Sequence, residues 1–124
     1  MVLGQLDDAL AAAPHDVELR QRRAYTLLGL GRAADALAEA TRAVLADGSD
    51  ALAWRSVGRA HLELGKVTAA VEALGTAHAL APERVEVRFD LGRALLAAGR
   101  AADAVPHLQW ASERSPRLAA LVSV

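Results

Sequence analysis

The sequence contains no cysteine, few aromatic residues and no long apolar run. Without cysteine the chain forms no disulfide, as is typical of proteins in a reducing compartment. No apolar segment approaches the roughly 20 residues that a membrane-spanning helix requires. Residues 1–10 include acidic side chains where a signal peptide would carry Lys or Arg. We therefore expect a cytoplasmic protein with no membrane partner.

An excess of positive charge is also missing. The chain has 14 basic and 15 acidic residues, two Trp, one Tyr and one Phe. A nucleic-acid-binding surface usually combines a basic patch with aromatic side chains. We therefore expect no nucleic-acid partner.

Motifs of common active sites are absent as well. The sequence has no Gly-x-Ser-x-Gly, no glycine-rich phosphate loop and no cysteine nucleophile. Its histidines show neither the i, i+3 or i+4 spacing nor the His-Glu-x-x-His pattern of helical metal sites; they are His15, His61, His78 and His107. We expect no enzymatic activity, no metal and no cofactor.

Apolar residues make up 53% of the chain and aromatic residues only 3%, so a core must be built from Ala and Leu. Such a core suits closely packed helices, because alanine has the highest helix propensity and a small side chain. No segment alternates apolar and polar residues for long enough to indicate a strand. The composition predicts an all-α fold.

Residues 51–84 carry small residues and helix breakers at spacings that indicate a helix, a turn and a second helix. Small side chains allow two helices to approach closely, a glycine separates them and a proline ends the second. These residues are Trp54, Gly58, Ala60, Gly65, Ala70, Ala77 and Pro82. The hexapeptide Gly-Arg-Ala-Ala-Asp-Ala occurs at residues 31–36 and again, two periods later, at residues 99–104. The chain is therefore built of repeated units.

This unit resembles the tetratricopeptide repeat, a helix–turn–helix of 34 residues. The resemblance implies an α-solenoid, a right-handed superhelix of antiparallel helix pairs. One domain over residues 1–124 would then contain a half repeat at 1–16 and repeats at 17–50, 51–84 and 85–118. Residues 119–124 form a tail or begin a capping helix. The tail either folds over the last helix or marks a longer array.

The same frame predicts seven helices. One lies within residues 1–16, and the others at about 17–30, 33–46, 51–64, 67–80, 85–98 and 101–114. Ala36, Ala70 and Ala104 are expected to be buried where paired helices touch. The first repeat has Arg20 and Arg23 where large apolar residues are usual. We expect their stems to cover apolar surface; the alternative is a salt bridge or a ligand contact.

The resemblance implies that the first helix of each repeat lines a concave groove that binds peptides. The candidate binding residues are Arg22, Tyr25, Arg55, Arg59, Leu62, Phe89, Arg93 and Leu96. Arginines dominate the centre of this predicted groove, where Asp90 is the single acid, and glutamates lie at its flanks. Arginine can hold a carboxylate through two parallel hydrogen bonds. An acidic peptide with an apolar anchor would fit; alternatively, the arginines pair with neighbouring acids.

We therefore predict a non-catalytic scaffold for protein–protein interaction, which binds a peptide or helix of a partner in its groove. One alternative is a structural module that self-associates, as a homo-oligomer, through the exposed ends of the array. Another is a regulatory segment of a larger multidomain protein.

Overall fold

The structure is a computed structural model that describes residues 2–122, with side chains up to Ala120. This part of the chain contains eight α-helices and no strand, so the all-α prediction is confirmed. The predicted number of seven helices was wrong, because the tail also forms a helix. The helices are α1 (Leu3–Ala12), α2 (Val17–Gly29), α3 (Ala33–Ala46), α4 (Ala51–Glu63), α5 (Val67–Leu80), α6 (Val85–Ala97), α7 (Ala101–Arg114) and α8 (Pro116–Val122).

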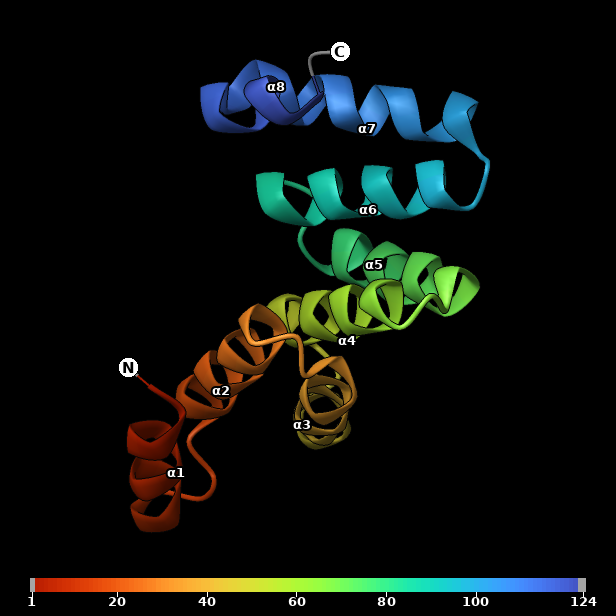
Figure 1. The fold of residues 1–124 in the computed structure, drawn as a ribbon. Coiled ribbons are helices and arrows are strands. Elements are labelled where there is room, and N and C mark those ends of the chain that lie inside the picture. The colour runs from red at the N-terminus through yellow and green to blue at the C-terminus, as the bar shows by residue number, and fades with distance from the viewer. Residues whose placement is uncertain (1, 123–124) are drawn as a thin grey trace.

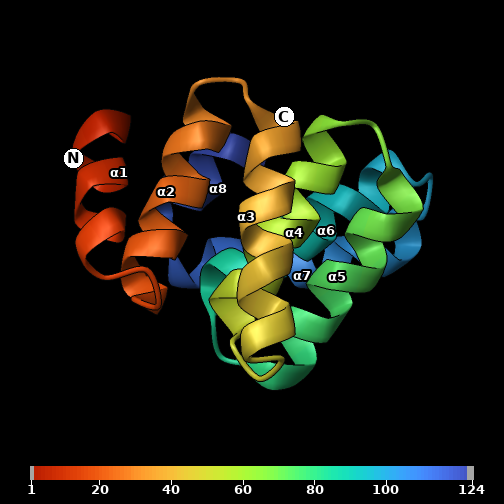
Figure 2. The same cartoon turned by 90° about the horizontal axis from the view of Figure 1, so that it is seen from below.

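The helices form an α-solenoid in which each packs against the next along the chain (Figure 1). Helices α2 and α3, α4 and α5, and α6 and α7 form the pairs. The first helices of successive pairs also touch, since α2 contacts α4 and α4 contacts α6. Seen from below, α1 lies beside α2 and α3 beside α4 (Figure 2). The first helices α2, α4 and α6 therefore share one continuous surface.

The two helices of each pair are joined by the same glycine turn. Gly31, Gly65 and Gly99 have φ angles of 76°, 76° and 75°. This left-handed conformation costs glycine little, because it has no Cβ. The residue after each glycine donates its backbone N–H to a carbonyl of the preceding helix: Arg32 to Leu27 at 2.9 Å, Lys66 to His61 at 2.8 Å and Arg100 to Leu95 at 2.8 Å. The recurring glycine thus sets the same reversal of direction three times.

Small residues allow the paired helices to approach. Ala36, Ala70 and Ala104 are each 0% exposed, as predicted from their position in the repeats. At Gly92 an added Cβ would lie 2.7 Å from the Cγ of Leu108, so this glycine makes room for a leucine on the partner helix. The close approach of the paired helices therefore limits the size of the side chains at their contact.

A buried acid distinguishes the first repeat. Glu39 of α3 is 7% exposed and lies between two arginines of α2. Its Oε2 is 3.2 Å from Nη1 of Arg23 and its Oε1 is 3.4 Å from Nη1 of Arg20. Nε of Arg23 also lies 2.7 Å from Oδ1 of Asp7 in α1. Predicted to cover apolar surface with their stems, the two arginines form ion pairs through their guanidinium groups. The alternative of a salt bridge holds, because Glu39 supplies the compensating charge.

The tail folds back as α8, which packs against α7 (Figure 1). Leu118 is half-buried and packs against the core cluster that contains Leu95 and Leu108. The first turn of α8 is held by Ser115, whose backbone carbonyl accepts from the N–H groups of Leu118 and Ala119 at 3.0 Å each. Leu121 follows Leu118 by three residues, so the sequence predicts that both pack on the last helix pair, but the side chain of Leu121 lies outside the described residues.

Candidate functional site

The eight candidate binding residues lie on helices α2, α4 and α6, which touch in sequence along the array. We call the surface that they form the first-helix surface. It comprises Arg22, Tyr25, Arg55, Arg59, Leu62, Phe89, Arg93 and Leu96.

The ring of Tyr25 in α2 lies near two arginines of α4, the next helix of this surface. The guanidinium carbons of Arg55 and Arg59, both from α4, are each 5.8 Å from the centroid of its ring. A guanidinium group near an aromatic face is attracted by the negative charge of the π-system. The ring therefore holds two cations of the neighbouring helix in place.

Asp90 joins the second and third helices. It is 4% exposed, and its Oδ2 accepts a hydrogen bond of 2.6 Å from Nε of Arg55. Burial alone would lower the pKa of Arg55, but the charge and hydrogen bond of Asp90 outweigh burial and raise it above its ordinary value. The other carboxylate oxygen of Asp90, Oδ1, is 4.0 Å from Nη1 of Arg93. Arg55 is thus a fixed structural cation.

The remaining arginines differ in how much of their charge is neutralised. Arg22 is exposed and pairs with Glu18 of the same helix at 2.9 Å. Arg93 keeps 49% of its side chain exposed and has only the long contact to Asp90. Within the described residues, Arg59 has no carboxylate partner. The pairing of arginines with neighbouring acids therefore applies to Arg22 and Arg55, whereas Arg59 has no such partner among the described residues. Binding of an acidic peptide stays a prediction.

The three apolar candidates differ in accessibility. Phe89 is 6% exposed and belongs to the core, so its ring offers little surface to a ligand, contrary to the expectation from sequence. It instead supports Arg93, whose guanidinium carbon is 5.9 Å from the ring centroid. Leu62 is half-buried against the same core, and Leu96 is 46% exposed. Leu62 and Leu96 are the accessible apolar groups.

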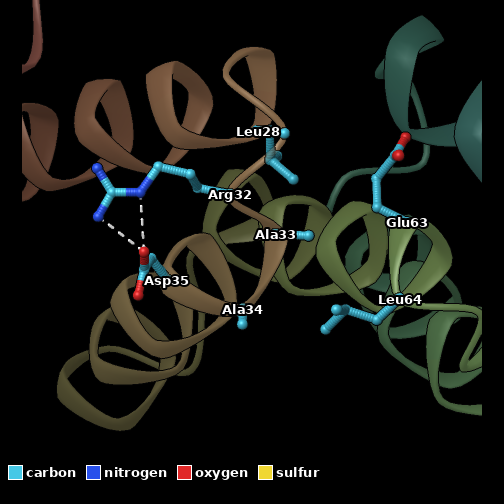
Figure 3. Close-up of a pocket in the computed structure, with 8 residues that line it drawn as sticks. Leu28, Arg32, Ala33, Ala34, Asp35, Glu63 and Leu64 are labelled. Atoms are coloured by element: carbon cyan, nitrogen blue, oxygen red, sulfur yellow. Dashed lines mark hydrogen bonds and ion pairs between the residues drawn. The ribbon is translucent and has the colours of Figure 1, made fainter.

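Sequence reasoning did not find the pocket of about 300 Å³ beside this surface (Figure 3). It lies between the turn after α2 and the end of α4, and Leu28, Ala33 and Leu64 supply its apolar lining. Glu63 stands at one side, while Arg32 turns toward Asp35, with which it pairs at 2.8 Å. The pocket brings together residues of two repeats, so no local motif indicates it.

A second group of side chains that the sequence spacing did not reveal lies on α5, α6 and α7. The rings of His78 and His107 meet edge to face with centroids 5.3 Å apart, although 29 residues separate them in the chain. Burial first, and the charge of Arg88 second, lower the pKa of both imidazoles below the ordinary 6.5. Burial and the neighbouring Arg88 thus favour the neutral form of both rings.

Among residues 2–122 no group of three or more His, Cys, Asp or Glu side chains is placed to hold a metal ion. In the same part of the chain, no helix is both long and apolar enough to cross a membrane.

A stack of antiparallel helix pairs with one recurrent glycine turn and a shared surface of first helices defines a helical-repeat protein. Tetratricopeptide repeat models match the sequence over residues 22–85 and over residues 61–123, each more than half of the chain. The chain therefore belongs to the tetratricopeptide repeat family. Members of this family act in general as non-catalytic scaffolds that bind other proteins.

Solved structures show the same fold. The crystal structure of MamA has a TM-score of 0.78 at 24% identity over 92% of this chain. MamA from Desulfovibrio magneticus RS-1 has a TM-score of 0.78 at 22% identity over 98%. A thermophilic tetratricopeptide repeat protein of Thermus thermophilus has a TM-score of 0.87 at 22% identity over 94%. The matches cover 67%, 67% and 66% of those chains. No curated protein matches the sequence significantly.

Proposed function

We propose that this chain binds an acidic peptide segment of a partner protein on the first-helix surface. The observation that carries the proposal is Arg59. This half-buried cation is held against Tyr25, and it has no carboxylate partner among the described residues. A cation that is already positioned loses little freedom when a ligand binds, which favours affinity.

Arg59 and Arg93 would receive the carboxylates of the peptide. The planar guanidinium group presents parallel N–H donors that match the two oxygens of a carboxylate. Tyr25 orients the first arginine and Phe89 the second, through the ring contacts of 5.8 and 5.9 Å. The two cations come from α4 and α6, so an extended peptide would have to cross two repeats to reach both.

Apolar side chains of the peptide would contact the leucines that border these cations. Leu62 and Leu96 stand at equivalent positions of two repeats, one half-buried and one 46% exposed. The pocket lined by Leu28 and Leu64 would accept one larger apolar side chain, since its volume of about 300 Å³ exceeds that of a single side chain.

The other candidates have supporting roles in this proposal. Arg55 is paired with Asp90 and lies beside the ring of Tyr25. Arg22, exposed and paired with Glu18, would contribute to attraction over a distance. We further propose that residues 1–124 act as one domain, with a half repeat at 1–16 and repeats at 17–50, 51–84 and 85–118.

A binding titration tests the proposal. The probe is a fluorescein-labelled peptide of alternating Glu and Leu, and the readout is its fluorescence anisotropy. We expect the double variant Arg59→Glu/Arg93→Glu to weaken binding about a hundredfold or more, because it removes two charge-assisted hydrogen bonds that are worth about 1.5–3 kcal/mol each. Raising the salt concentration should weaken binding to the wild-type chain, since salt screens surface charges.

The matched control is Arg42→Glu/Arg84→Glu, which makes the same change of net charge at two exposed arginines outside the first-helix surface. It should change the affinity less than twofold. Equal losses in the two double variants would reduce the effect to net charge, and no loss in the first would refute the site. Self-association through the ends of the array, the alternative reading, would appear as a sedimentation coefficient that rises with protein concentration.

A further inference from the structure

The indole of Trp110 in α7 is the centre of a cationic cluster away from the first-helix surface. The guanidinium carbons of Arg88 and Arg114 are 4.1 and 4.0 Å from the centroid of its ring. Nε of Arg88 donates to Nδ1 of His107 at 3.3 Å, and His107 in turn packs against His78. We call these five residues the Trp110 cluster.

Negative charge around this cluster is sparse. Within the described residues Arg88 has no carboxylate partner, and Arg114 has only Glu113, at 3.8 Å. Asp103, the acid that acts on His107, is itself paired with Arg100 at 3.0 Å. The Nε1 donor of Trp54 binds the carbonyl of Gly48 at 2.8 Å, whereas no acceptor for Nε1 of Trp110 occurs in the described part of the chain.

In the first repeat, the equivalent arginine is paired with a buried carboxylate. Arg20 is the equivalent of Arg88, and Glu39 is the equivalent of His107. In the first repeat the buried carboxylate of Glu39 neutralises the arginine at 3.4 Å. The third repeat keeps the arginine but has an imidazole in place of the carboxylate, and burial and Arg88 lower the pKa of that imidazole. The charge that Glu39 supplies internally is therefore missing from the third repeat.

We propose that the Trp110 cluster is a second docking site, which takes the carboxylates of an acidic segment of a partner protein. Arg88 and Arg114 receive the carboxylate oxygens, and Nε1 of Trp110 donates a further hydrogen bond. Trp and Arg are the residues that most often dominate the energetics of protein interfaces. Stacking on the indole holds both guanidinium groups before the partner arrives, so little side-chain entropy is lost on binding.

Charge favours a protein over a nucleic acid as the occupant. The chain carries a net charge of −1, and only two arginines contact the indole. Nucleic acids need a basic surface that follows many phosphates, because each neutralised phosphate adds to the affinity. A short run of Asp or Glu matches a cluster of two cations.

The test follows the indole N–H resonances of the ¹⁵N-labelled wild-type chain during titration with hexaglutamate at low salt. The chain has two tryptophans, so it gives two such signals, which a Trp110→Phe variant assigns. We expect the signal of Trp110 to shift with saturation and that of Trp54, hydrogen-bonded to Gly48, to stay in place.

Four variants make the test specific. Arg88→Gln and Arg114→Gln should each weaken hexaglutamate binding about fivefold or more. His107→Glu should abolish it while the chain remains folded, because it places a carboxylate beside Arg88 as Glu39 does beside Arg20. The double variant Arg59→Glu/Arg93→Glu on the first-helix surface should leave the shift of the Trp110 signal unchanged. The proposal for the Trp110 cluster and the proposal for the first-helix surface can therefore be refuted independently.

Several results would overturn the proposal. These are a Trp110 signal that does not respond to hexaglutamate, full binding in His107→Glu, or tighter binding of a single-stranded oligonucleotide of equal charge. The last would indicate a phosphate-binding surface instead.

Discussion

Gly58 of α4 lies directly against Leu74 of α5: a Cβ on the glycine would be 2.4 Å from the Cγ of the leucine. The same relationship recurs between Gly92 and Leu108, where the distance would be 2.7 Å. In the first repeat the equivalent residues are both alanines, Ala24 and Ala40. The helix contact therefore accommodates either a glycine with a leucine or two alanines, with one large side chain at most.

This relationship predicts a coupled pair of substitutions. Gly58→Ala should lower the free energy of unfolding by about 1–3 kcal/mol, because the contact becomes overpacked. Leu74→Ala alone should cost about 2–5 kcal/mol, because it leaves a cavity. The double variant, which reproduces the alanine pair of the first repeat, should cost clearly less than the sum. Urea unfolding of the four proteins measures the coupling.

Gly75→Ala is the control, since a Cβ there would meet no atom within 4 Å. It lies inside α5 and should raise stability by about 0.5–1 kcal/mol, because alanine favours the helix over glycine. Additive losses at Gly58 and Leu74 would show that the two residues do not share one space.

The buried acid of the first repeat leads to a second prediction. Glu39→Gln should lower the free energy of unfolding by about 1–3 kcal/mol, because Arg20, about three-quarters buried, loses its carboxylate partner, and Arg23, equally buried, is left with Asp7 alone. Circular dichroism during thermal unfolding measures the loss. Asp35→Asn, at an exposed acid that pairs with Arg32, is the control and should change stability by less than about 1 kcal/mol.

The second repeat suggests a replacement for this ionic cluster. Its equivalents of Arg20, Arg23 and Glu39 are Trp54, Val57 and Ala73. The triple variant Arg20→Trp/Arg23→Val/Glu39→Ala should be about as stable as the wild type or more so, since apolar packing often matches a buried ion pair. A strongly destabilised but folded triple variant would show that the charges stabilise this repeat in a way that packing does not replace.

The histidines predict how stability depends on pH. Burial, followed by the charge of Arg88, lowers the pKa of His78 and His107 below 6.5 in the folded chain. The unfolded chain therefore binds more protons as the pH falls through 6.5, and stability falls with it. Above about pH 6.5 the stabilisation is fully present. Urea unfolding between pH 7.5 and pH 5 should show the decrease.

Replacement of both rings should reveal their share of this decrease. His78→Gln/His107→Gln should show a shallower pH dependence than the wild type, whereas His15→Gln, at an exposed residue between α1 and α2, should leave it unchanged. Burial and then the nearby Lys66 also lower the pKa of His61, so some dependence should persist. Parallel curves for all three proteins would contradict the role of the paired imidazoles.

The sequence by itself determined seven of the eight described helices, the glycine turns between paired helices and the small residues at their contacts. Glycine turns, helix ends and apolar spacing depend on neighbours within a few residues. The repeated turns at Gly31, Gly65 and Gly99 could therefore be predicted from the sequence. The division of residues 1–124 into repeats within one domain stays a prediction, as do the binding residues.

Only the tertiary structure decided which charges are neutralised. Asp90 reaches Arg55 across 35 residues, Glu39 reaches two arginines of another helix, and His78 meets His107 across two helices. These contacts depend on the register between helices and on the rotamers of long side chains, which local spacing does not specify. The same applies to Phe89, whose helical position suited either the groove or the core, and whose burial depends on how α6 packs within the core cluster.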